Sequence, residues 1–127
     1  MAGNPVCLAA GVATLAELAE GGAYRHIEML GRHLDSALAR HALSSQAQLP
    51  RVGPIVWPYF DTRGALPVAA SSISPQAIDE YHRRYRGWLA HGVYLPPSAY
   101  EVCFLSAAHT TSDVDKLLDV LATSEKA

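Results

Sequence analysis

The sequence has few lysines, few cysteines and no long apolar run. In 127 residues the only lysines are Lys116 and Lys126, and the only cysteines are Cys7 and Cys103. The cysteines form no CxxC pair, which excludes that type of zinc knuckle or redox motif and predicts reduced, packed thiols. Apolar residues are nowhere continuous over the ~18 positions of a membrane span, and the segment 1–11 lacks the basic start of a secretory signal. We therefore expect a cytoplasmic protein.

Charge is balanced and spread out, which argues against several classes of partner. The 10 basic and 12 acidic residues form no cationic cluster of the kind that binds nucleic acid or an anionic membrane. The 6 histidines include no pair at the i, i+4 spacing that places two imidazoles on one helical face, and no HExxH motif. We therefore predict no metal site, no nucleic acid and no membrane.

Length and composition predict one folded unit, and the first half of the chain is helical in pattern. A chain of 127 residues that is 50% hydrophobic can bury one core, so we expect a single domain over 1–127. Asn4 and Pro5 are typical of a helix start, which predicts a helix over 5–20. A second helix is expected over 24–43, with an apolar stripe formed by Ile27, Leu30, Leu34 and Leu38.

The middle of the chain has a strand-like composition interrupted by prolines. Residues 51–61 are rich in β-branched and aromatic side chains, but Pro54 and Pro58 each remove a hydrogen-bond donor, so we predict an edge or bulged strand. Residues 62–73 show no period and predict a surface loop. A third helix begins at the Ser74-Pro75 pair and ends at Gly92, with one side formed by Ile78, Tyr81, Tyr85, Trp88 and Leu89.

The last third predicts two short strands and a helix. The strands are expected at 93–95 and 102–106, and the helix near Ser112, where Asp115 completes a capping-box pattern. Its buried side is predicted to hold Val114, Leu117, Leu118 and Leu121. Together the segments predict an α+β domain: a small, mainly antiparallel sheet of about three strands, with about four helices packed on one face.

Few residues suggest catalysis. Lys116 lies off the apolar stripe of the last helix and Lys126 lies near the end of the chain, so both are expected to be solvated rather than activated as nucleophiles. No GxSxG motif or Gly-rich phosphate loop is present. The unusual element is the turn that ends in Glu101, a carboxylate between Tyr100 and an apolar run. Glutamate in such a place is more often solvated than functional, so the residues alone leave its role open.

Two stretches nevertheless resemble a known family. Residues 3–5 (GNP), leading into an Ala-rich helix and followed by 51–53 (RVG), resemble the opening of the small domain in class III aminotransferases. Residues 91–101 (HGVYLPPSAYE), continued by 104–110 (FLSAAHT), are similar to the glutamate-1-semialdehyde aminomutase branch. The resemblance covers nearly the whole chain and implies the C-terminal small domain of a fold-type I, pyridoxal-phosphate-dependent enzyme.

The resemblance also implies an activity and roles for individual residues. The complete enzyme would be a homodimer that moves an amino group within glutamate 1-semialdehyde to give 5-aminolevulinate, the tetrapyrrole precursor. Its glutamate that faces the cofactor and substrate amino groups matches Glu101, and Ser98 lies in the same turn. The turn Gly3-Asn4-Pro5 would form the junction with the large domain.

The pyridoxal-phosphate-binding machinery is expected to be absent from this chain. By the same resemblance, the lysine that binds the cofactor covalently and the aspartate that pairs with its pyridine nitrogen belong to the large domain and would precede Met1. A threonine that contacts the phosphate in the neighbouring subunit also lies upstream in the family. We therefore expect the chain to bind no cofactor and to be inactive alone.

One segment departs from the family, and other interpretations stay open. Residues 62–74 (TRGALPVAASSIS) stand where the family usually reads GPVxNYxDA, so a related class III aminotransferase is an alternative. A standalone interaction or scaffold module is another. Either a large domain or self-association would then cover apolar surface left by the core. The helix at 5–20 is the candidate for this surface, although an ordinary core helix has the same composition.

Overall fold

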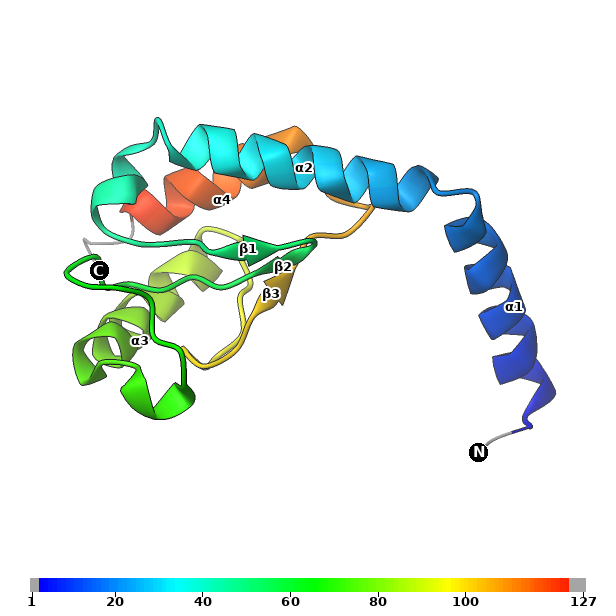
Figure 1. Cartoon of the computed structure of the whole chain (residues 1–127), viewed down its shortest axis with the longest axis horizontal. Coiled ribbons are helices and arrows are strands. Elements are labelled where there is room, and N and C mark those ends of the chain that lie inside the picture. The colour runs from blue at the N-terminus through cyan, green and yellow to red at the C-terminus, as the bar shows by residue number, and fades with distance from the viewer. Residues whose placement is uncertain (1–2, 124–127) are drawn as a thin grey trace.

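The computed structural model describes residues 3–123, and Figure 1 shows helices arranged around a small sheet. The α-helices are α1 (Pro5–Ala19), α2 (Gly22–Leu38), α3 (Pro75–Ala90) and α4 (Thr111–Thr123). The strands are β1 (Arg51–Val52), β2 (Ile55–Val56) and β3 (Cys103–Phe104), and two 3-10 helices are η1 (Ala42–Ser45) and η2 (Ala70–Ser72). The strands form one antiparallel sheet in the order β1-β2-β3. The predicted α+β class is therefore confirmed.

Two predicted helix starts are confirmed by their capping contacts. The side chain of Asn4 accepts a hydrogen bond from the Val6 N–H at 2.9 Å, and Pro5 occupies the first turn of α1. The hydroxyl of Ser74 accepts from the Ala77 N–H at 3.1 Å at the start of α3. These contacts satisfy backbone donors that have no partner within the helix.

The helix predicted over 24–43 is shorter than expected. The structure ends α2 at Leu38 and continues with the 3-10 helix η1. Nδ1 of His41 accepts a hydrogen bond from the Leu43 N–H at 3.2 Å, while its Nε2 lies 3.1 Å from a carboxylate oxygen of Asp119. These contacts accompany the turn of the chain after α2 and link it to α4, a long-range effect that local periodicity does not reveal.

The predicted strand at 51–61 is wrong as a single strand. Gly53, with φ of +57°, and Pro54 form a turn that divides the segment into the hairpin β1-β2. Glycine adopts this left-handed conformation without a Cβ clash. Beyond the hairpin, Tyr59 pairs only through an isolated bridge to Gln48.

Both later strands also differ from the prediction. Residues 93–95 form no strand, because the Val93 N–H instead bonds to the Trp88 carbonyl at 2.9 Å and closes the end of α3. The strand predicted over 102–106 is reduced to β3, which pairs with β2 over two residues.

The capping box of α4 lies earlier than predicted. The Thr110 N–H donates to the Asp113 carboxylate at 2.7 Å, and the Asp113 N–H donates to the Thr110 hydroxyl at 3.3 Å. The backbone hydrogen bond from Thr110 lowers the pKa of Asp113. Ser112 and Asp115 therefore do not form the box. Three of the four predicted core residues of α4 are buried, and the fourth, Leu117, is half-buried.

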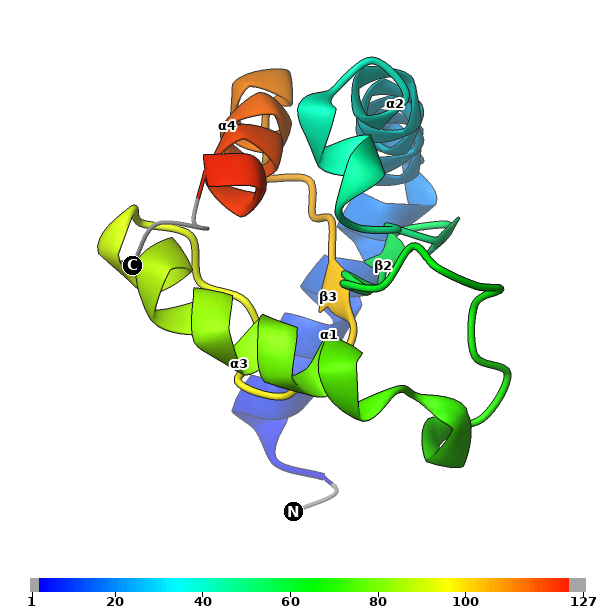
Figure 2. The same cartoon turned by 90° about the vertical axis from the view of Figure 1, so that its left-hand side faces the viewer.

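The core lies between two helical layers. Helices α2 and α4 run side by side, and α3 crosses on the other side of the core (Figures 1 and 2). An aromatic cluster from α3 and the chain after β2 fills the centre, with ring centroids of Tyr81 and Trp88 4.9 Å apart and those of Phe60 and Trp88 5.3 Å apart. Leucines of α2 and α4 complete the core: Leu30, Leu34, Leu118 and Leu121.

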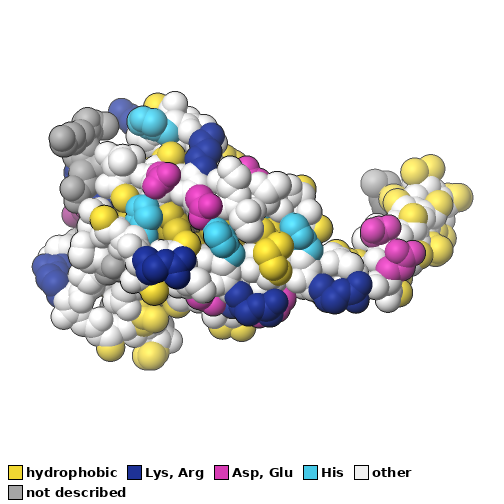
Figure 3. Space-filling model, turned by 90° about the horizontal axis from the view of Figure 1, so that it is seen from above, with side chains coloured by type: hydrophobic (Ala, Val, Ile, Leu, Met, Phe, Trp, Pro, Cys, Tyr) yellow, Lys and Arg dark blue, Asp and Glu magenta, His cyan; other side chains and the backbone are white. Residues whose placement is uncertain are grey.

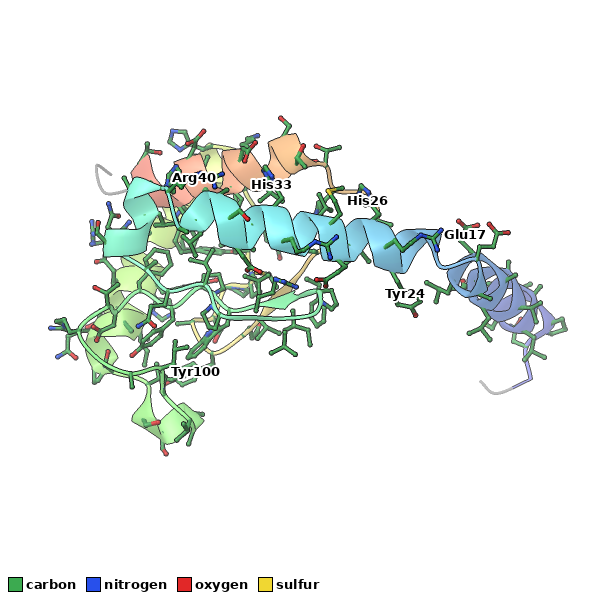
Figure 4. The ribbon with its side chains drawn as sticks, turned by 45° about the horizontal axis from the view of Figure 1, so that its top comes forward. Glu17, Tyr24, His26, His33, Arg40 and Tyr100 are labelled. Carbon is green, nitrogen blue, oxygen red and sulfur yellow. The ribbon has the colours of Figure 1, made fainter. Side chains whose placement is uncertain are left out.

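Histidine side chains of α2 contact α4 and the segment just before it. Nε2 of His33 lies 2.7 Å from a carboxylate oxygen of Asp115, and His26 bonds to the carbonyl of His109 at 2.8 Å. Figure 3 shows histidine and acidic side chains gathered over these two helices, and Figure 4 shows His26 and His33 along α2. Two histidines that the sequence left unassigned thus link α2 to α4 and to the segment that leads into it.

A buried arginine on α3 connects three parts of the core. Arg84 is 2% exposed, and its guanidinium donates to Glu80 in the same helix. It also donates to the side chain of Gln46 at 3.0 Å and to the backbone carbonyl of Leu121 at 3.1 Å. The charge lies 5.1 Å from the centre of the Phe60 ring. Leu89, predicted on the packed side of this helix, is 42% exposed.

The carboxylate of Asp61 holds the loop before α3. It accepts hydrogen bonds from the Arg63 backbone and guanidinium at 3.0 Å and from the Ser74 hydroxyl at 2.9 Å. The hydrogen bond from the Arg63 side chain is the largest of the effects that hold the pKa of Asp61 well below its usual range. The loop is thereby anchored to the residue that caps α3.

Helix α1 extends away from the body of the molecule (Figure 1). None of its residues is buried, and Cys7, predicted to be packed, is exposed. Within 3–123 no single helix is long and apolar enough to cross a membrane, and only α1 and α2 together, bent by 61°, reach the required length and composition. Of the two alternatives for this helix, an ordinary core helix and an exposed apolar surface, the structure shows the exposed surface.

The outer face of the sheet is also uncovered and apolar. The register pairs Ile55 with both Val52 and Phe104, so the three side chains form one row on the same face. They are 37%, 79% and 60% exposed, respectively. The opposite row includes Val56, which is 2% exposed and faces the core.

Replacing the buried arginine should lower stability. Arg84→Ala would leave the Leu121 carbonyl without its donor and open a cavity, so we expect the free energy of unfolding to fall by about 3 kcal/mol. Arg84→Met, which keeps the apolar stem, should cost less. Urea denaturation measures both. The control Arg86→Ala removes an exposed arginine of the same helix and should change stability by less than ~0.5 kcal/mol.

Asp61 should make stability sensitive to acid. Its pKa is lower in the folded chain than the usual ~3.9 of the unfolded chain, so its carboxylate stabilises the fold above about pH 4. This contribution is lost as the pH falls toward the folded pKa. Between about pH 5 and pH 2 the free energy of unfolding, measured by urea denaturation, should therefore fall less steeply with pH for Asp61→Asn than for the wild type. Asp79→Asn, on an exposed carboxylate, should keep the wild-type slope.

Candidate active-site turn

Residues 96–101 form a turn between the end of α3 and β3. The turn is closed internally, because the Glu101 N–H donates to the Ser98 carbonyl at 3.1 Å and the Tyr100 N–H lies 3.3 Å from the Ser98 hydroxyl. Glu101 is exposed and Ser98 is half-buried. The carboxylate of Glu101 makes no hydrogen bond or ion pair with another residue of 3–123. The turn therefore presents an unpaired carboxylate to the exterior.

Two aromatic side chains attach this turn to the core. The Tyr81 hydroxyl donates to the Pro96 carbonyl at 2.7 Å, and the Trp57 indole N–H donates to the Ala99 carbonyl at 2.9 Å. Tyr81 is 1% exposed and Ala99 is 5% exposed. The turn is thus held from α3 on one side and from the chain after β2 on the other.

The predicted junction turn lies elsewhere in the molecule. Gly3, Asn4 and Pro5 are exposed at the start of α1, and Gly3 has φ of +97°. Figure 1 shows this end of α1 apart from β3 and the turn that precedes it. Within this chain, the two predicted functional regions therefore do not form one site.

A cavity of about 240 Å³ lies beside the candidate turn. Trp57 and Tyr100 form one wall, and the other wall comes from the loop before α3: Pro67, Val68, Ala69, Ala70 and Ile73. Figure 4 shows Tyr100 well away from α2, beyond the strands. Residues 62–74, which depart from the family pattern, therefore line the cavity beside the turn 96–101, which matches that pattern.

A second cavity, of about 330 Å³, contains the only lysine that the structure describes. It lies between residues 92–95, β3 and the first half of α4, and Lys116 lines it together with Asp113 and His109. Lys116 is exposed, as predicted, whereas an amine that holds an aldehyde cofactor must be partly desolvated to react. The carboxylate of Asp113 is already engaged by the Thr110 capping contacts. Within 3–123 these residues therefore do not fit a covalently bound pyridoxal phosphate, and Lys126 lies outside the described residues.

Other nucleophiles and ligands in the described part offer no alternative centre. The Cys103 thiol donates to the Val56 carbonyl at 3.2 Å, and burial raises its pKa to about 11, so it is not a thiolate at neutral pH. Residues 3–123 contain no group of three or more His, Cys, Asp or Glu side chains placed to hold a metal ion. The candidate turn with Glu101 remains the best-defined site.

Sequence reasoning found the turn but missed what supports it. Tyr81 was predicted on the packed side of α3 because of its spacing, but the spacing does not show where its hydroxyl points. Trp57 follows a strand and precedes Pro58, and no motif indicates that its N–H reaches a carbonyl 42 residues later. The signal that could have found both is the buried polar aromatic, which usually needs a hydrogen-bond partner.

Comparisons with known proteins agree with the family resemblance of the sequence. No protein-family model matches the chain. Over 95% of its length the chain is similar to a glutamate-1-semialdehyde 2,1-aminomutase of Thermus thermophilus, at 40% identity, and over 94% to one of Desulfosudis oleivorans, at 35% identity. The chain spans only 29% and 28% of these relatives. The resemblance stated from the motifs is therefore confirmed over nearly the whole chain.

A solved structure supports the fold. An omega-transaminase from Sphaerobacter thermophilus superposes on 96% of the chain with a TM-score of 0.75, and the match covers 28% of that protein. The sequence identity is 22%, so this likeness concerns the fold alone. The arrangement of helices around a three-stranded sheet thus occurs as one part of a larger transaminase.

Proposed function

Starting from its similarity to the glutamate-1-semialdehyde aminomutases, we propose that this chain acts as the small domain of a pyridoxal-phosphate-dependent aminomutase. The complete enzyme would move an amino group within glutamate 1-semialdehyde to give 5-aminolevulinate, and would work in the cytoplasm. The observation that carries the proposal is the match of 95% of the chain to 29% of an aminomutase. The motif-bearing turn in this match projects its carboxylate outward.

Glu101 is the proposed functional residue of the chain. Its carboxylate is exposed and has no partner within residues 3–123, so it is available to a group outside this domain. In the complete enzyme it would accept hydrogen bonds from amino groups of cofactor and substrate, because an ionised carboxylate is an acceptor only. Ser98, which closes the same turn, would help to set its direction.

The remaining chemistry would come from outside this domain. Pyridoxal phosphate supplies an aldehyde that activates amino groups, and it needs a desolvated lysine. Lys116 is exposed. The cavity that it borders is also lined by Asp113, whose carboxylate already caps α4. We therefore infer that the chain is inactive alone and that the cofactor is held by the large domain of the complete enzyme.

The apolar surface of α1 is proposed to contact a partner. Leu8, Val12 and Leu15 lie on one side of the helix and are 59%, 69% and 68% exposed. Monomeric soluble proteins rarely leave a contiguous apolar strip of this kind uncovered. We propose that α1 is covered in the complete enzyme, and that in the isolated chain it causes self-association.

A chimaera tests the proposed role of Glu101. The chain would replace its matched segment in the Thermus thermophilus aminomutase, and 5-aminolevulinate formation would be measured. We expect activity in the chimaera, and a loss of about 10-fold or more in kcat for Glu101→Gln, because the amide keeps the shape of the side chain but loses the charge, and a hydrogen bond to a charged group contributes roughly 1.5–3 kcal/mol. Asp79→Asn is the control, and the isolated chain is the blank. Full turnover of the Glu101→Gln chimaera would refute the role.

Charged substitutions test the α1 surface. In sedimentation velocity, the average mass of the wild-type chain should rise with concentration, because α1 of one copy can cover apolar surface of another. Leu8→Glu with Val12→Glu should keep the chain monomeric, since burying a carboxylate in an apolar contact is costly. Thr14→Glu adds the same kind of charge on another side of α1 and should change association less. A wild-type chain that stays monomeric at every concentration would contradict the proposal.

A further inference from the structure

We propose that Tyr81 and Trp57 are the positioning residues of the Glu101 turn. Each donates one hydrogen bond from the core to a carbonyl of the turn, and together they hold the turn on two sides. The relevance of this arrangement to catalysis rests on the proposed function of Glu101. Neither residue is part of the motif that matches the aminomutases, so the assignment comes from the contacts alone.

Tyr81 is well placed to act as a rigid donor. Its ring is 1% exposed and packs edge-on against Trp88, with centroids 4.9 Å apart, and against Phe60 at 6.2 Å. Its hydroxyl therefore has little freedom when it reaches the Pro96 carbonyl at 2.7 Å. Burial is the largest of the effects that raise the pKa of Tyr81, and the charge of Glu101 adds to them. The phenol thus remains a protonated donor at neutral pH.

Trp57 holds the other side of the turn. Its indole N–H is 2.9 Å from the Ala99 carbonyl, and its ring lies 5.0 Å from that of Tyr59. Tyr59 is buried and is itself paired with Gln48 through two backbone hydrogen bonds. The indole is therefore supported by a part of the backbone that does not belong to α3.

The two anchors bracket the residues that carry the candidate chemistry. Pro96 and Ala99 lie on either side of Ser98, and Glu101 follows two residues after Ala99. The hydrogen bond from the Glu101 N–H to the Ser98 carbonyl then fixes the backbone of Glu101 relative to the anchored segment. A catalytic group is useful only if supporting contacts hold it close to its working geometry, and side chains fixed in the core are suited to that task.

The test compares two tyrosines of the same helix. Tyr81→Phe removes only the donating hydroxyl, whereas Tyr85→Phe removes a hydroxyl that has no hydrogen bond within residues 3–123. Amide hydrogen exchange of the full chain, followed by NMR, would report on Tyr100 and Glu101. We expect their exchange to become about fivefold faster in Tyr81→Phe, the ratio that corresponds to one net hydrogen bond. Tyr85→Phe should leave it within about twofold.

A second variant separates local positioning from general stability. Trp57→Phe keeps an aromatic ring but removes the N–H, and it should also accelerate exchange at Tyr100 and Glu101. In both variants the native-state NMR shifts of residues 96–101 should change while those in the middle of α4 stay as in the wild type, because a lost anchor alters the turn in the folded state, whereas a general loss of stability alters only the rate of opening. If the shifts and the exchange of the turn amides are both unchanged, the positioning role is overturned.

The outcome is independent of the proposed function. Accelerated exchange at the turn together with a fully active Glu101→Gln chimaera would uphold the anchors and reject the role of Glu101. Unchanged exchange together with an inactive Glu101→Gln chimaera would do the opposite.

Discussion

The buried guanidinium of Arg84 is the constraint on which the packing of this domain depends. A cation that is 2% exposed must have partners, and Arg84 takes them from Glu80, Gln46 and Leu121. These contacts tie α3 to the end of α4 and to the segment after η1. The guanidinium presents its N–H donors in a rigid, planar fork and can serve these partners at once, which an apolar side chain cannot do. The orientation of α3 in the core follows from this requirement.

The candidate site depends on the same helix. Tyr81 lies three residues before Arg84, so the rotation of α3 that buries the guanidinium also turns the tyrosine inward. From there its hydroxyl meets the Pro96 carbonyl, while Trp57 meets the Ala99 carbonyl from the sheet side. The turn is therefore attached to rigid elements although its carboxylate faces outward. This combination of a fixed backbone and a free functional group suits a residue that acts on something outside the domain.

The surface that the core leaves uncovered supports the proposal of a larger enzyme. The side of α1 formed by Leu8, Val12 and Leu15 is exposed, and so is the sheet row with Val52 and Phe104. Burial of such surface stabilises a protein by roughly 25 cal/mol per Å², so an exposed apolar helix is an unfavourable end state for a chain alone. The chain matches only 29% and 28% of the length of the two relatives named above, which agrees with that inference.

The sequence by itself determined the α+β class, the four helices with the starts of two of them, and the turn that carries Glu101. These features follow from local signals: caps, prolines, apolar spacing and a contiguous motif. Only the tertiary structure decided the hairpin at Gly53, the end of α2 at Leu38, the burial of Arg84 and the anchoring of the turn. The last three depend on contacts between residues distant in sequence or on a rotation of a helix, and a periodic pattern contains no information about either. The hairpin is local, but the sheet to which it belongs is completed only by β3, about 50 residues later. No local pattern indicates that Arg84 is buried, because two of its partners, Gln46 and Leu121, lie 38 and 37 residues away in the sequence.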